Sequence, residues 1–90
     1  MTVYEEEEAM ITGVKYQLDR VSTRQEINAI YRRARNWNSL HSFWAGACDH
    51  DRYAELNEIF KSLRRNALQK VLFSTLNDAA FFILNGAVSA

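Results

Sequence analysis

Apolar residues recur along most of this chain at steps of three and four, the spacing of one face of an α-helix. The first stripe predicts a helix over residues 3–20. Thr2 and Glu5 fit a capping box at its start, and the run Glu5–Glu8 places negative charge where the helix dipole favours it. Gly13 either weakens this helix or lets another backbone approach it.

A second stripe follows a second pair of candidate caps, either Ser22 with Gln25 or Thr23 with Glu26. The polar residues of the segment 36–39 then interrupt the apolar spacing. We therefore expect a second helix that loosens near residues 36–39 and breaks at Gly46, whose missing side chain suits a C-terminal cap.

The clearest stripe lies within residues 53–71 and predicts a third helix, capped by Asp49 or Asp51. Thr75 and Asp78 have the spacing of a further cap, so the remainder is either a fourth helix or the continuation of one long helix. No segment alternates polar and apolar residues as a half-buried strand would. The expected fold is all-α, a small three- or four-helix bundle forming a single helical domain over residues 1–90.

Composition narrows the function classes. The chain has 90 residues, of which 48% are apolar, so it forms one small domain with a real core. Eleven basic residues balance eleven acidic ones, so no global basic field favours nucleic acid or an anionic membrane. One cysteine cannot form an internal disulfide, and the acidic N-terminal segment does not fit a signal peptide. These features predict a cytoplasmic protein.

The most apolar tract, residues 71–90, is interrupted by polar residues, and its longest unbroken apolar run is Ala79–Leu84. That run is shorter than the roughly 20 residues of a membrane span, so we expect no membrane segment. Its apolar residues cover every face of a helix, and a small bundle has no centre deep enough to surround them. We expect a homodimer or another protein partner to cover this segment; the alternative is that it is the central helix of the monomer.

Candidate catalytic and metal-binding residues form a weak pattern. Cys48, Asp49, His50 and Asp51 adjoin one another, with His41 before them, but they lack the paired spacings of a zinc site. Cys48 and His50 are two positions apart and point to different sides of a helix or strand, which does not suit a nucleophile and its base. We therefore predict no catalytic residue, no metal and no cofactor, and the protein is not expected to be an enzyme.

Arginines form the more informative polar pattern. Arg32, Arg33 and Arg35 fall mostly off the apolar stripe of the second helix, and Arg64 and Arg65 follow in the third. We expect these five to select an acidic partner electrostatically. The alternative is that they bind DNA or RNA directly, with Trp37 as an aromatic stacking platform.

Two resemblances bear on function. The segment of residues 14–56, with its Asp49-His50-Asp51-Arg52-Tyr53-Ala54-Glu55-Leu56 run, resembles the Hha/YmoA family of nucleoid-associated modulators. That resemblance implies a cytosolic helical protein that acts by binding a silencer protein, with Asp49 or Asp51 as the acidic contact. The stretches Thr23–Tyr31 and Tyr53–Arg65 are similar to a helical module of phage recombination proteins.

Together these observations predict a non-catalytic regulator or adaptor that acts by protein–protein binding, in a bacterial, phage or plasmid setting. Rigid aromatic and large aliphatic side chains supply most of the binding energy at protein interfaces. The residues predicted at the interface are Trp37, Trp44, Phe81, Phe82, Ile83 and Leu84.

Overall fold

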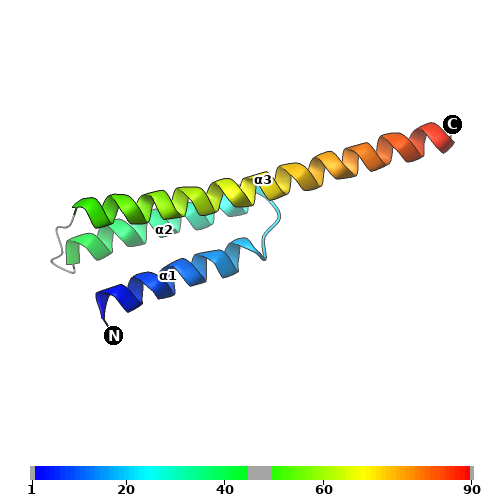
Figure 1. Ribbon diagram of the computed structural model, residues 1–90. Helices are drawn as coiled ribbons and strands as arrows, with labels where there is room; N and C mark the ends of the chain where they lie inside the picture. The colour runs from blue at the N-terminus through cyan, green and yellow to red at the C-terminus, as the bar shows by residue number, and fades with distance from the viewer. Residues whose placement is uncertain (1, 45–49, 90) are drawn as a thin grey trace.

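The computed structural model describes residues 2–44 and 50–89, which form three α-helices. These are α1 (Val3–Leu18), α2 (Arg24–Trp44) and α3 (His50–Ser89). Figure 1 shows α1 and α2 lying alongside the first part of α3, while the rest of α3 extends beyond them. The all-α prediction is confirmed for the described residues, with three helices rather than four.

The N-terminal helix α1 begins at the predicted cap. The Thr2 hydroxyl accepts a hydrogen bond from the backbone N–H of Glu5 at 3.1 Å. The helix ends at Leu18, two residues earlier than predicted, where Asp19 caps it by donating its N–H to the Lys15 carbonyl. A Cβ on Gly13 would meet nothing within 4 Å, so no other backbone approaches it.

Of the two candidate caps of α2, the structure uses Thr23. Its hydroxyl accepts from the backbone N–H of Glu26 at 3.2 Å and donates to the Glu26 carboxylate at 2.6 Å. The predicted loosening at residues 36–39 is wrong, because α2 is continuous through Trp44. The reason is tertiary: Asn38 is fully buried against α3 and hydrogen-bonded there. The predicted break at Gly46 lies outside the described residues.

The separate fourth helix is also wrong, because α3 is one continuous helix of 40 residues. The Thr75 hydroxyl donates to the Val71 carbonyl at 3.0 Å, a bond to the preceding turn rather than a helix cap. Asp51 lies in the first turn of α3, whereas Asp49 lies outside the described residues. The single-helix alternative is therefore confirmed.

The core lies where all three helices meet. Its centre is the contact between α2 and α3, with Ile27 and Ala34 of α2 wholly buried and Leu56 and Phe60 of α3 each 1% exposed. The other buried apolar residues are Val14, Leu18, Ile30, Tyr31 and Ala67. The predicted apolar stripes of α1, α2 and the first part of α3 all contribute to this core.

The long helix α3 has two unlike halves, which we call the packed half, residues 51–71, and the arm, residues 72–85. Every residue of the arm is exposed. Figure 1 shows this part of α3, coloured orange to red, running clear of α1 and α2. The alternative that Ala79–Leu84 forms the centre of the monomer is therefore wrong, because all six residues are exposed and no described residue covers them.

One described helix is long and apolar enough to cross a membrane by length and composition. It spans Asp51–Asn85, and its most apolar window of 18 residues has a mean hydropathy of 1.2 and is 6% buried. The expectation of no membrane segment rested on the short unbroken run Ala79–Leu84. The mean hydropathy of 18 residues, by contrast, includes the polar residues that interrupt the tract.

Candidate protein-binding surfaces

Most of the large apolar side chains that are exposed among the described residues lie on the arm. Its large apolar side chains are between 54% and 78% exposed. They are Leu72, Phe73, Leu76, Phe81, Phe82, Ile83 and Leu84. Contiguous apolar surface of this kind marks a binding site in soluble proteins.

Part of the apolar surface of the arm points away from the bundle. At about 100° per residue, Leu76 lies nearly half a turn around α3 from the buried Phe60, and Leu72 and Ile83 lie on the same side as Leu76. Phe81 and Phe82, by contrast, lie within about 60° of the direction of Phe60. The end of the arm is therefore apolar on both sides.

The bundle-facing side of the arm mixes polar residues with Phe81 and Phe82 and lacks basic residues. Ser74 and Asp78 continue the bundle-facing side of α3, and the Asn85 amide donates to the Phe81 carbonyl at 2.8 Å. Helices that lie on anionic membranes carry Lys and Arg on the polar face. From residue 71 to the end of the chain there is no Lys or Arg.

A second surface lies between α2 and α3, and we call it the arginine groove. It has a volume of about 370 Å³ and contains three arginines and no acidic residue among its lining residues. Those residues are Asn28, Tyr31, Arg32, Arg35, Asn36, Ser39 and Arg64. Of the five predicted arginines the structure thus brings three together, while Arg33 and Arg65 are exposed outside the groove.

Tyr31 forms the floor of the arginine groove and is 8% exposed. The guanidinium of Arg64 lies 4.2 Å from the centre of its ring, and that of Arg35 lies 5.8 Å away. Stacking on an aromatic face holds a guanidinium in one plane. The Nε of Arg64 is buried without a hydrogen-bond partner among the described residues.

The groove borders a hydrogen-bonded pair of hydroxyls. The Tyr53 and Ser39 hydroxyl oxygens are 3.2 Å apart. The pKa of Tyr53 is lowered, chiefly by this contact with Ser39, then by Asn57, with a further contribution from the positive charge of Arg35. The direction of this shift is the one expected beside an excess of positive charge.

A third polar cluster, the Glu7 cluster, joins α1 to the other helices. Glu7 is 5% exposed and accepts a hydrogen bond at 2.8 Å from Nε of Arg52, which also donates to Glu55 at 3.0 Å. These two carboxylates, Glu7 first, raise the pKa of Arg52. His41 lies 3.6 Å from Glu7 and 3.7 Å from Glu6, and its ring stacks on Trp37 with centroids 4.5 Å apart. This cluster holds the helices together.

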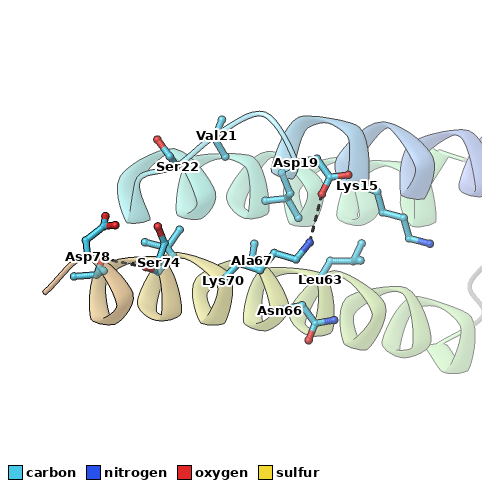
Figure 2. A pocket seen from close by; sticks show the side chains of 13 residues that line it. Lys15, Asp19, Val21, Ser22, Leu63, Asn66, Ala67, Lys70, Ser74 and Asp78 are labelled. Carbon is cyan, nitrogen blue, oxygen red and sulfur yellow. Dashed lines mark hydrogen bonds and ion pairs between the residues drawn. The ribbon is translucent and has the colours of Figure 1, made fainter. Parts of the chain in front are cut away.

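A cleft of about 600 Å³ opens where the arm leaves the bundle, and Figure 2 shows the side chains around it. Lys70 of α3 and Asp19, at the end of α1, form an ion pair across it at 3.7 Å, drawn as a dashed line. Both side chains are largely exposed, so this ion pair contributes little to stability. The cleft lies on the bundle-facing side of α3, opposite the side that carries Leu72, Leu76 and Ile83.

The remaining predicted site residues divide between the surface and the bundle. Phe81, Phe82, Ile83 and Leu84 are all exposed on the arm. Trp37 is half-buried and stacked, so it serves packing within the chain. Trp44 ends α2, and Asp51 is exposed. Cys48 and Asp49 lie outside the described residues.

Sequence reasoning missed the neutral residues of the groove, although a signal for them exists. Asn28, Arg32, Arg35 and Ser39 recur at steps of four, three and four, the same period that marks an apolar stripe. Applied to polar residues, this test would have separated Arg32 and Arg35 from Arg33. The partner arginine, Arg64, comes from another helix and leaves no such local signal.

Within residues 2–44 and 50–89, no group of three His, Cys, Asp or Glu side chains could hold a metal ion. Comparison with protein-family models, with curated proteins and with solved structures finds no match to the chain. The surfaces described above are therefore the basis for assigning a function.

Proposed function

We propose that this protein is a non-catalytic helical regulator or adaptor that acts by protein–protein binding, and that the arm of α3 pairs it with a second copy of itself. The observation that carries the proposal is the apolar surface of the arm, on which seven large apolar side chains are each more than half exposed. The setting that we propose is cytoplasmic and bacterial, phage or plasmid, as the two family resemblances imply.

The arm offers enough apolar surface for a stable dimer. Burying one large apolar side chain stabilises by about 1.5–3 kcal/mol, so the seven exposed side chains offer on the order of 10 kcal/mol. Association opposes this with about 4–15 kcal/mol of lost freedom. The two quantities are of similar size, so most of these side chains must be buried, and a second arm offers the same set of apolar side chains around a two-fold axis.

Charge on the packed half favours an antiparallel pair. The side of α3 that carries Leu72 continues towards the N-terminus through Arg65 and Glu58, two and four turns earlier. A parallel pair would set Arg65 against Arg65 and Glu58 against Glu58, and like charges repel. An antiparallel pair joins only the arms and leaves the two bundles at opposite ends. Small-angle X-ray scattering should therefore give a particle much longer than the 65 Å of one chain.

A membrane is a poorer occupant of the arm. Spanning would place Asp78, near the middle of the apolar tract, in hydrocarbon, which costs about 2.5–3.5 kcal/mol. Binding at a membrane surface would lack basic residues on the polar side.

The decisive experiment is light scattering over a concentration series. We expect the wild-type protein to be a dimer, and the double variant Phe81→Ser/Phe82→Ser to be a folded monomer with unchanged helical circular dichroism. The matched control is Leu40→Ser, which removes an apolar side chain of similar exposure, 59%, from the bundle. It should stay dimeric.

Two results would contradict the proposal. One is a wild-type protein that remains monomeric at all concentrations. The other is flotation with vesicles of phosphatidylcholine and phosphatidylglycerol that the Phe81→Ser/Phe82→Ser variant loses, because that result assigns the arm to lipid.

A further inference from the structure

We propose that the arginine groove binds an acidic segment of a partner protein, through pairs of carboxylates held by Arg32, Arg35 and Arg64. The inference rests on the proposed protein-binding function, since it names the chemistry of one partner, but it concerns a different surface from the arm.

The groove is a site of uncompensated positive charge. Three guanidinium groups converge on about 370 Å³, and no lining residue is acidic. Across the described residues, ion pairs form at Arg52, Lys61 and Lys70 and the two contacts of His41, but at none of these three arginines. A chain of zero net charge that leaves three cations together without counter-charges offers a selective anion site.

The geometry of the groove suits carboxylates. Arg32 and Arg35 are three residues apart on α2, so their side chains lie about one turn apart on one face. Arg64 faces them from α3, with its guanidinium over the Tyr31 ring, 4.2 Å from the ring centre. A guanidinium makes planar two-point contact with a carboxylate. Asn28, Asn36 and Ser39 add neutral donors and acceptors for a peptide backbone.

Nucleic acid fits this surface less well. Binding to single strands combines backbone charges with open aromatic faces on which bases stack. Tyr31 is 8% exposed and its ring is covered by Arg64, and Trp37 is stacked on His41 at 4.5 Å. The aromatic platform on which the nucleic-acid alternative depended is thus already occupied by side chains of this chain.

The test is fluorescence anisotropy with a labelled oligoglutamate peptide of about ten residues, roughly 33 Å when extended. The wild type should bind it with an affinity that falls as salt rises. The variant Arg35→Gln/Arg64→Gln should bind at least about tenfold more weakly. The control, Arg33→Gln/Arg65→Gln, removes the same charge from exposed positions outside the groove and should bind within about twofold of wild type.

The outcome separates this inference from the proposed function. The arm variant Phe81→Ser/Phe82→Ser should bind the peptide like wild type. Peptide binding by the arginine groove can therefore be tested even if the protein does not dimerise. Equal losses in both arginine pairs would overturn the inference, because they would show attraction to charge without a site. Absence of peptide binding would also overturn it. So would an oligothymidine strand of equal length that binds more tightly and displaces the peptide, which would assign the groove to phosphates.

Discussion

The two halves of α3 belong to one continuous helix but differ in how far their apolar side chains are buried. The packed half turns Leu56 and Phe60 towards α1 and α2, where both are 1% exposed, whereas the arm turns Leu76 to the other side and leaves it 54% exposed. Both halves are rich in large apolar residues, so composition does not distinguish them. Phe82 lies on the same side of α3 as Phe60 and is nevertheless 78% exposed, so the difference lies in the neighbours: α1 and α2 lie alongside the packed half (Figure 1). Burial is decided by what packs against a residue as well as by its hydrophobicity.

The arm is helical although all its residues are exposed, because it continues a helix that the packed half has already formed. A separate helix of this length is marginal in water, because nucleation is unfavourable. The arm avoids that step, since the packed half already supplies the preceding turns. Local bonds such as that from the Thr75 hydroxyl to the Val71 carbonyl follow the helix rather than cause it.

The largest expected effect comes from one substitution made in each half. Phe60→Ala removes a ring that is 1% exposed and should lower the free energy of unfolding by about 3–5 kcal/mol. Phe82→Ala removes a ring that is 78% exposed and should change the stability of the bundle by no more than about 0.5 kcal/mol. Urea denaturation at low protein concentration, followed by circular dichroism, measures both. Equal losses would mean that the arm folds back onto the bundle in solution.

A smaller effect is expected where α1 is anchored to the packed half. Glu7→Gln removes the charge that accepts the 2.8 Å hydrogen bond from Arg52, which should lower the free energy of unfolding by about 1–3 kcal/mol. Arg52 is 31% exposed and keeps Glu55, so we place the loss below that of a fully buried ion pair. Glu8→Gln, on the exposed side of the same helix, is the control and should have little effect. If both substitutions have the same small effect, Glu7 does not anchor α1.

A similar or slightly smaller effect is expected where α2 is anchored to the packed half. Asn38→Ala deletes the amide that donates to the Tyr53 carbonyl at 3.1 Å and to the Asn57 side chain at 2.9 Å. Two partly buried acceptors lose this donor, and the loss should be about 1–2 kcal/mol in urea denaturation. Asn36→Ala, two residues earlier and exposed, should be nearly neutral. Equal behaviour of the two asparagines would show that the buried amide is not what keeps α2 continuous.

Much of this architecture could be predicted from local sequence. The caps at Thr2 and Thr23 and the stripes that supply Ile27, Leu56 and Phe60 follow from short-range spacing, and the structure has them. The exposure of Phe81 and Phe82 also followed, since apolar residues on every face of a helix cannot all be buried in a small bundle.

The predictions that were wrong share a physical cause, which is that contacts between helices are not encoded in local spacing. Asn38 has the local signature of a loosened helix, but its NH2 group donates to residues 15 and 19 positions away in the sequence. The meeting of Arg64 with Arg32 and Arg35 likewise depends on how α2 packs against α3. Thr75 and Asp78 have the spacing of a cap, yet a helix that is already formed runs through them. Local spacing predicts elements, whereas partners across helices come from the packing.

The smallest expected effect tests whether the arm is coupled to the bundle at all. Ala54→Gly in the packed half and Ala79→Gly in the arm make the same change at exposed positions of one helix, each worth about 0.5–1 kcal/mol of helix stability. In the packed half this loss should appear in global unfolding, because fraying there releases core contacts. In the arm it should leave global unfolding unchanged and appear only as faster amide hydrogen exchange near residue 79. Measured in the Phe81→Ser/Phe82→Ser background, a global loss from Ala79→Gly would contradict independent halves, since it would require arm helicity to support the bundle.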